Sequence, residues 1–400
     1  MPEIVRLVRC ASVLGLSMLP LQEGIAHEDE EIEEIVVRGR WDRPTGLSVS
    51  ASQGFVSQAE IDIRPRLRPG DILEVVPGLI VTQHSGTGKS NQMFLRGFNL
   101  DHGTDFATWI DGMPINMPTH GHGQGYTDLN FIIPELVDSI EFRKGPYYSD
   151  VSDFSSAGAA FFSTPARLES GIVKGGIGQD GFGQLLYADS FSADHGDLLL
   201  GVQAHTYDGP WVGVSEDLRK YNGVLRYTRS TPDDVEWNVM LMAYDAEWNS
   251  ADQVPLRAVE AGLVSPLGTI DDTVGGATSR YSLSGRWHRD IGDQQFTARA
   301  YAIDYELDLF SNFTYFLEDP ENGDQFQQVD DRVVYGGDLR WRHSAGTEAA
   351  HEVGLVARYD DIDNVGLHTS AQRERTGTVR EDSVGQLSAG LYYNYERVWN

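Results

Sequence analysis

Three histidines in two glycine-rich segments are the side chains of this sequence best suited to chemistry. His102 lies in the run Asn99-Leu-Asp-His-Gly, and His120 and His122 alternate with glycines in the run that spans residues 120–125. Imidazoles are common ligands of transition metals, and two of them at positions i and i+2 of a flexible loop can share an ion with a neighbouring carboxylate, Asp101 or Asp105. Three uses stay open: metal coordination, hydrogen bonding to a polar ligand such as a metal chelate, and plain solvation of a polar loop.

Nothing else in the sequence predicts a catalytic centre. The run His-Ser-Gly-Thr-Gly-Lys-Ser at residues 84–90 looks like a phosphate-binding loop, but the spacing of that motif requires a glycine where Gln83 stands. No arrangement of Ser, His and Asp, or of Cys and His, indicates a nucleophile, so we expect no enzyme. The net charge of −29 argues against nucleic acid as a partner, because its phosphates require Lys and Arg.

The histidine segments lie among three short β-prone runs that end in turn signatures. These signatures are Arg96-Gly97, then Asp111-Gly112-Met-Pro, then Glu141-Phe-Arg143-Lys144-Gly145-Pro146. In this order they resemble the plug domain of TonB-dependent outer-membrane receptors. The resemblance implies a small α/β plug domain over residues 50–168, followed by an antiparallel transmembrane β-barrel over residues 169–400.

The same resemblance implies roles for individual residues. The loops after the first two signatures lie on the outward side of such a plug, so the expected ligand-binding residues are His84, Asp101, His102, His120, His122 and Gln124, with His102, His120 and His122 as the candidate metal ligands. Arg96, Arg143 and Lys144 are expected to form ion pairs within the plug or with the barrel, and Glu141 is one expected partner.

Helices and strands of the plug can be placed from local signals. Ser57-Gln-Ala-Glu60 has the form of a capping box, which predicts a short helical turn. Residues 68–78, with Pro69 near the start and Pro77-Gly78 as the stop, predict a second helix. Short strands are expected at residues 79–82, 93–96, 107–111 and 139–143.

The N-terminus has the pattern of an exported protein. Arg6 and Arg9 precede a short apolar stretch, and small residues end at Ala26, so residues 1–26 are expected to be a signal peptide that carries away the only cysteine, Cys10. Residues 27–49 then form a periplasmic tail. By resemblance this tail holds the TonB box, Glu34, Ile35, Val36, Val37 and Arg38, an extended segment that can add as a strand to a partner's sheet.

From about residue 171 the apolar residues recur at every second position. Tyr301 to Leu309, Val333 to Trp341 and Leu387 to Tyr395 each alternate apolar with polar or charged side chains, and we expect the apolar faces to point at lipid. Connections alternate between tight turns and long loops, with long loops expected at about 208–218, 248–277, 308–330 and 361–382. Sorting of loop lengths to the two rims is typical of outer-membrane barrels.

About ten strands can be counted, whereas plugged transporters have about 22. An open sheet would leave unpaired edges in lipid, so we expect this chain to be the N-terminal part of a longer receptor, truncated after about ten strands.

The expected function is energy-coupled uptake across the outer membrane of a Gram-negative bacterium. The partners implied are a TonB-type protein in the periplasm, outer-membrane lipid and an extracellular small molecule such as a siderophore or metal chelate. No permanently bound cofactor is expected, only a transition metal or chelate as cargo. A passive outer-membrane channel and a soluble secreted β-rich binding protein are the alternatives.

Overall fold

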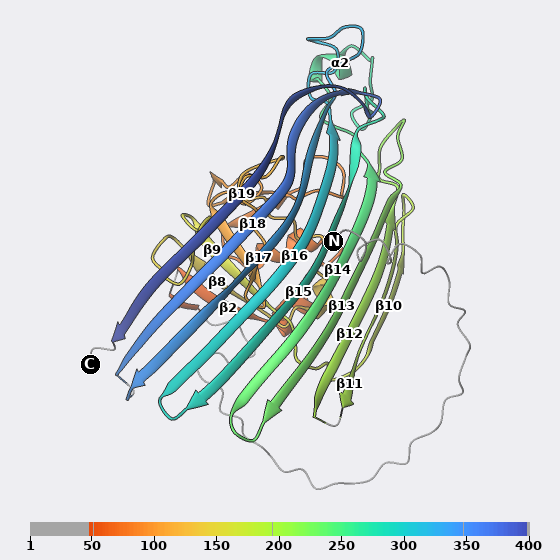
Figure 1. Ribbon diagram of the computed structural model, residues 1–400. Coiled ribbons are helices and arrows are strands. Elements are labelled where there is room, and N and C mark those ends of the chain that lie inside the picture. Colours follow the sequence, from red (N-terminus) through yellow and green to blue (C-terminus); the bar gives the residue numbers. More distant parts are fainter. Residues whose placement is uncertain (1–47, 51, 194, 347, 398–400) are drawn as a thin grey trace, which may run out of the picture. The chain divides into compact units, whose positions relative to one another are not determined.

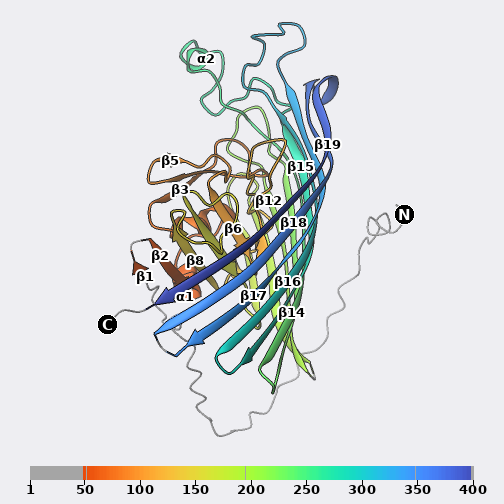
Figure 2. The ribbon, with the colours of Figure 1, turned by 60° about the vertical axis from the view of Figure 1, so that its left-hand side comes forward.

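The structure is a computed structural model that describes residues 48–50, 52–193, 195–346 and 348–397. All of these residues fall within one compact unit, Arg43–Asn400. A small mixed domain, up to about residue 168, lies against the inner face of a curved ten-stranded sheet (Figures 1 and 2). The expected signal peptide and the expected TonB box lie outside the described residues.

The small domain is built on a six-stranded sheet with the order β1-β2-β8-β9-β6-β7 and a three-stranded sheet, β3-β4-β5. The bounds of the first set are β1 Ser48–Ser50, β2 Gln53–Ser57, β8 Ser139–Lys144, β9 Gly158–Ser163, β6 Phe106–Ile110 and β7 Met113–Pro114. Those of the second are β3 Leu79–Thr82, β4 Gln92–Leu95 and β5 Phe98–Asn99. Only β6 and β9 pair in parallel, and the other pairs are antiparallel.

The two turn signatures have the same local cause. Arg96 and Gly97 adopt φ of 52° and 83° between β4 and β5, and Asp111 and Gly112 adopt φ of 50° and 87° between β6 and β7. Two positive φ values in succession are those of the type I′ turn, which matches the twist of paired strands. The sequence therefore closes two hairpins at the points where Arg-Gly and Asp-Gly occur.

The expected helices are shorter or tighter than predicted. The first is α1, Gln58–Asp62, and its N-cap Ser57 makes no capping hydrogen bond through its side chain, so the capping box does not form. The second is a 3₁₀ helix, η2, at Pro69–Val75, not an α-helix over residues 68–78. A further 3₁₀ turn, η3, spans Pro134–Leu136. Among the described residues, no helix is long and apolar enough to cross a membrane.

The large sheet runs antiparallel in chain order from β10 to β19. Its strands are β10 Ile172–Ile177, β11 Gly183–Ala193, β12 Gly196–Tyr207, β13 Leu218–Thr231, β14 Val235–Asn249, β15 Gly275–Ile291, β16 Gln294–Ser311, β17 Phe326–Ala345, β18 Ala349–Ala371 and β19 Glu374–Arg397. The short helix α2, Leu256–Glu260, lies in the connection between β14 and β15. The predicted ten strands are thus present, but several are longer than predicted.

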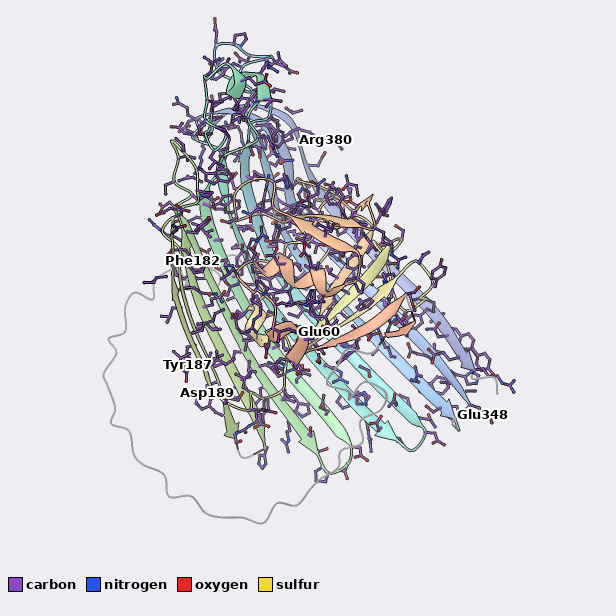
Figure 3. All side chains as sticks on the ribbon, turned by 180° about the vertical axis from the view of Figure 1, so that it is seen from behind. Glu60, Phe182, Tyr187, Asp189, Glu348 and Arg380 are labelled. Carbon is purple, nitrogen blue, oxygen red and sulfur yellow. The ribbon has the colours of Figure 1, made fainter. Side chains whose placement is uncertain are left out.

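Connections of different length gather at opposite ends of the large sheet. Tight turns join the strands at one rim, here named the turn end, and the long connections with α2 gather at the other, the loop end (Figure 1). Seen from behind in Figure 3, Glu348 marks the turn end and Arg380 lies toward the loop end. The predicted long loop at 361–382 is wrong: β18 and β19 continue to a two-residue turn, Gln372-Arg373, with φ of 51° and 64°.

The outer face of the large sheet is apolar over most strands. Tyr335, Leu339 and Leu391 are 50%, 57% and 77% exposed, as predicted for side chains that face lipid. On β16 the prediction is wrong. Ile303 and Tyr305 are buried in the core, whereas Glu306 is exposed, because this part of the strand passes the small domain, whose apolar surface it covers.

Candidate functional site

The three histidine-bearing loops of the small domain approach the loop end of the large sheet. His84 lies in the loop between β3 and β4, His102 between β5 and β6, and His122 in the long segment after β7. The first loop touches the large sheet directly: Ser250 accepts a hydrogen bond from the Gly86 amide at 2.8 Å, and Gln253 donates to the His84 carbonyl at 2.8 Å.

His102, His122 and His84 form a cluster of imidazoles. The Nε2 atoms of His102 and His122 are 3.2 Å apart, and their ring centroids are separated by 4.6 Å. The His84 ring centroid lies 5.2 Å from that of His102, and the buried Nδ1 of His84 has no hydrogen-bond partner. Of the six residues predicted to bind ligand, the structure brings these three together.

The cluster is neutral at ordinary pH because water is largely excluded from it. Burial lowers the pKa of His84 to about 4, with a smaller contribution from the nearby Lys89 ammonium. Burial also lowers the pKa of His102 and holds the pKa of His122 well below its usual range. Unprotonated imidazole is the form that binds metals.

His120 has a different environment from the other histidines. Its Nδ1 accepts a hydrogen bond from the His122 amide at 3.1 Å, and its Nε2 lies 3.2 Å from the Tyr305 hydroxyl. The ring stacks on Tyr126 with centroids 4.1 Å apart, and burial holds the pKa of His120 well below its usual range. Both ring nitrogens are engaged within the protein, so this conformation offers no lone pair of His120 to a metal.

The remaining predicted ligand residues lie at the edge of the cluster. Asp101 is exposed, and its carboxylate is 3.7 Å from His102 Nε2. Gln124 is exposed, and its side-chain oxygen accepts a hydrogen bond from the Thr119 amide at 2.9 Å. Among the described residues, no three or more His, Cys, Asp or Glu side chains form a complete metal-binding group.

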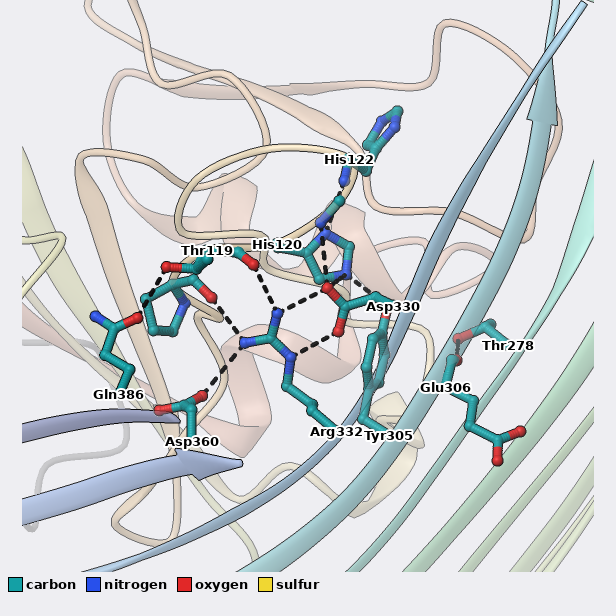
Figure 4. A network of polar contacts seen from close by, with 12 residues as sticks. Thr119, His120, His122, Thr278, Tyr305, Glu306, Asp330, Arg332, Asp360 and Gln386 are labelled. Atoms are coloured by element: carbon teal, nitrogen blue, oxygen red, sulfur yellow. Dashed lines mark hydrogen bonds and ion pairs between the residues drawn. The ribbon is translucent and has the colours of Figure 1, made fainter. Parts of the chain in front are cut away.

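The loop that carries His120 and His122 is held by a buried ion cluster on the large sheet (Figure 4). Arg332 of β17 contacts Asp330 at 2.6 and 2.7 Å and Asp360 of β18 at 3.3 Å. The same guanidinium donates to the Pro118 carbonyl at 2.7 Å and to the Thr119 carbonyl at 3.0 Å.

This contact has a simple physical reason. The segment after β7 has little regular strand pairing, so its backbone groups need other partners. Side chains of the large sheet supply them: Arg332 serves two carbonyls, Arg358 donates to the Asn116 carbonyl at 2.7 Å, and Asp330 accepts from the Gly121 amide at 3.1 Å. We name Asp330, Arg332 and Asp360 the clamp.

The turn-signature residues support the framework of the small domain. Arg143 pairs with Glu141 at 2.7 Å and with Asp150 at 2.8 Å. Asp111 pairs with Arg226 of the large sheet at 3.2 Å. Gly145 has a φ of 88°, and Pro146, which follows it, is exposed.

The two other cations differ in their surroundings. The Lys144 ammonium is buried and lies 3.5 Å from the Pro77 carbonyl, and burial, helped by Arg96, lowers its pKa. The Arg96 side chain is exposed, and its amide donates to the Gly78 carbonyl at 2.8 Å.

A polar cavity of about 610 Å³ separates the small domain from the large sheet. It lies toward the turn end, on the far side of the clamp from the histidine cluster. Six arginines line it: Arg143, Arg226, Arg286, Arg299, Arg340 and Arg358. A cavity of this size, with charged side chains in its lining, has room for water between the two parts.

Comparisons with known proteins agree with this architecture. Residues 45–159 match the family model described as the TonB-dependent Receptor Plug Domain. These residues are the plug domain of a TonB-dependent receptor. The small domain is therefore the plug, and the large sheet is barrel wall.

Relatives and solved structures show how much of such a receptor is present. The chain is 23% identical to the vitamin B12 transporter BtuB of Vibrio vulnificus (strain CMCP6) over 248 residues, which are 59% of this chain and 39% of that protein. It is similar to the copper transporter OprC, with a TM-score of 0.64 at 17% identity over 88% of this chain and 52% of that one. For the unliganded ferric citrate transporter FecA the TM-score is 0.67 at 14% identity, over 87% and 54% of the two chains.

The receptor contains site residues that the sequence did not reveal. Gln328, Asp330 and Arg332 hold the ligand loop, yet they lie some two hundred positions away in a strand whose pattern shows only alternation. Lys89 is buried and acts electrostatically on His84 and His102. The signal for Lys89 in the sequence is its place in a glycine-rich loop after a plug strand.

Proposed function

We propose that the full-length receptor takes up a scarce extracellular solute, a siderophore, a metal chelate or a metal ion, by energy coupling through a TonB-type periplasmic partner. The chain spans 39% of the curated relative and about half of the solved structures, so this activity is proposed for the whole protein. The relatives' names give vitamin B12, copper and ferric citrate as their cargo.

The observation that carries the proposal is the nature of the contact between plug and barrel wall. Leu73, Phe106 and Ile140 of the plug belong to an apolar core that also includes residues of the wall, such as Met240 and Ile303. Many of the plug's bonds to the wall are polar, such as those of Arg226, Arg332 and Arg358, and the arginine-lined cavity adjoins them. Polar bonds can be exchanged for bonds to water at small net cost, so a plug held in this way can shift without losing its own fold.

The two ends of the wall support an inward direction of uptake. The proposed ligand residues His84, His102 and His122 gather under the long loops, on the side where we expect an extracellular solute to arrive. The proposed grip for the partner, Glu34, Ile35, Val36, Val37 and Arg38, precedes the plug in the chain. A passive channel does not need a plug, and a soluble binding protein does not need an outward apolar face.

Deleting Glu34 to Arg38 in the full-length receptor tests the proposal. Cells would be given radiolabelled ferric citrate, cobalamin, zinc and copper in turn, with receptor-free cells as the baseline. We expect at least one probe to accumulate with the intact receptor, and the deletion to stop accumulation while leaving binding at the cell surface unchanged. Accumulation that survives the deletion, or no accumulation of any probe, would contradict the proposal.

A further inference from the structure

The contact between His102 and His122 carries information about the protons on both rings. His102 Nδ1 lies 3.2 Å from the Asn91 carbonyl oxygen, which can only accept, so Nδ1 bears the proton. His122 Nδ1 lies 2.8 Å from Gln328 Oε1. The Gln328 amide is oriented by its own nitrogen, which donates to the Gly121 carbonyl at 2.8 Å, so its oxygen faces His122 and that Nδ1 is also protonated.

A neutral imidazole carries one proton, so both Nε2 atoms present lone pairs. These two atoms face each other at 3.2 Å. Two acceptors at this distance repel unless something positive lies between them. When both rings are neutral, the pair therefore lacks a positive group between its two lone pairs.

From this geometry we infer that His102 and His122 coordinate a first-row transition-metal ion through their Nε2 atoms, as the point on the plug that captures the cargo's metal. Two metal–nitrogen bonds of about 2.0–2.1 Å at a tetrahedral angle place the nitrogens roughly 3.3 Å apart. The observed separation of 3.2 Å fits that spacing with little movement.

The surroundings have the form usual for metal-binding histidines. Ligating imidazoles commonly donate their other N–H to a carbonyl oxygen, which fixes the tautomer and the ring orientation. Here the Asn91 carbonyl oxygen, in the plug, accepts from His102, and Gln328 Oε1, in the barrel wall, accepts from His122. The Nδ1 of His84, on a ring beside His102, is a third buried nitrogen near the pair, and it has no hydrogen-bond partner.

Nitrogen ligands also define the class of ion. Imidazole suits zinc, copper, nickel and iron, whereas calcium and magnesium select oxygen. Two protein ligands leave the other coordination positions to water or to a chelator. The same site chemistry therefore admits a free ion or the exposed metal of a chelate.

This inference rests on the proposed uptake function and names its cargo more closely. Its test is metal binding by the full-length receptor in detergent, with Zn²⁺, Cu²⁺, Ni²⁺ and Co²⁺ added as simple salts in one arm and as citrate complexes in the other. We expect binding of at least one ion, and a loss of more than about 100-fold in affinity in His102→Ala and in His122→Ala. Binding of the simple salts would show that the ion alone is a sufficient ligand. Binding of the citrate complexes alone would show that the ligand is a chelate.

Two further variants keep the test decisive if an alanine variant folds poorly. Gln328→Ala leaves both ligands in place but frees the His122 ring, and we expect about a 10–100-fold loss of affinity. His288→Ala, near the turn end of β15, is the matched control and should bind as the wild type does. For Cu²⁺, electron paramagnetic resonance should show coupling to two imidazole nitrogens in the wild type and to one in each single variant.

Wild-type affinity in a variant that carries both His102→Ala and His122→Ala, or no binding by the wild type in either arm, would overturn the inference. The second result leaves a shared proton between the rings as the explanation of their contact. If the metal does not bind while deletion of Glu34 to Arg38 still stops uptake of another solute, this inference fails and the proposed function stands. If the metal binds but uptake continues after the deletion, the metal site stands and the proposed function fails.

Discussion

At the scale of single residues, Arg332 links the plug's ligand loop to the barrel wall. Its side chain is 0% exposed, as is that of Asp330. A buried charge is costly unless it is paired and fully hydrogen-bonded, and here two carboxylates and two backbone carbonyls surround the guanidinium. The clamp therefore fixes the loop of His122, whose ring contacts Gln328 of β17.

Arg332→Met is expected to loosen this loop strongly. Breaking a buried pair leaves the carboxylates uncompensated, at a cost of about 3–5 kcal/mol. Hydrogen exchange of residues 116–124 in the full-length receptor measures the effect as a lower free energy of local opening. Arg342→Met is the matched control, since its pairs with Glu352 and Glu396 are partly exposed, and about 0–1 kcal/mol is expected there. Equal protection in the two variants would contradict the role given to the clamp.

At the scale of elements, the sequence predicted what depends on local chemistry. Arg96-Gly97 and Asp111-Gly112 marked two hairpins, because glycine supplies the second positive φ that the turn requires. The turn at Gln372-Arg373 has the same geometry without glycine, so its residues gave no signal and a long loop was predicted instead.

Features that depend on the neighbour of an element could not be predicted in this way. Alternation on β16 marked an apolar face correctly, but the plug, not lipid, covers Ile303 and Tyr305. Two of the three predicted metal ligands, His102 and His122, do come together, yet the position of His120 is decided by Tyr126 and Tyr305. An alternating pattern shows that the two faces of a strand differ in polarity. It does not show which part of the protein or membrane each face contacts.

The loop at residues 84–90 owes its position to a close approach to β14. A Cβ added to Gly88 would lie 2.0 Å from ring atoms of Trp248, so Gly88→Ala must displace the loop or the indole. We expect a loss of roughly 1–3 kcal/mol in the local stability of this loop, measured by hydrogen exchange. Adding Trp248→Ala should recover part of the loss.

Gly390→Ala is the matched control, because nothing lies within 4 Å of the added atom. Equal effects of Gly88→Ala and Gly390→Ala would show that the loop does not dock on Trp248.

At the scale of the whole molecule, the histidine cluster, the clamp and the arginine-lined cavity follow one another from the loop end toward the turn end. On the proposed uptake route, a solute captured at the cluster meets the clamp before it reaches the cavity. The proposal therefore requires the plug to move relative to the wall. A ligand shifts that equilibrium only by contacts that differ between the two states, and the loop of His122 is the element that touches both the ligand site and the clamp.

A reversible tether between plug and wall tests this requirement most directly. A Cβ on Gly86 would lie 2.9 Å from Cβ of Ser250, slightly less than the roughly 3.5–4.5 Å of a disulfide, so a small loop shift lets Gly86→Cys and Ser250→Cys join. Cys10 is the only cysteine of these 400 residues. Thr228→Cys with Asn238→Cys, on paired positions of β13 and β14, is the control that links the wall to itself.

The deciding measurement is uptake of a probe that the intact receptor accumulates. Uptake is measured in cells whose receptor carries the oxidised tether, before and after a reductant is added. We predict that the plug-to-wall tether stops uptake, that surface binding persists, that the reductant restores uptake, and that the wall-to-wall control transports throughout. Full uptake with the plug covalently fixed to the wall would contradict the account.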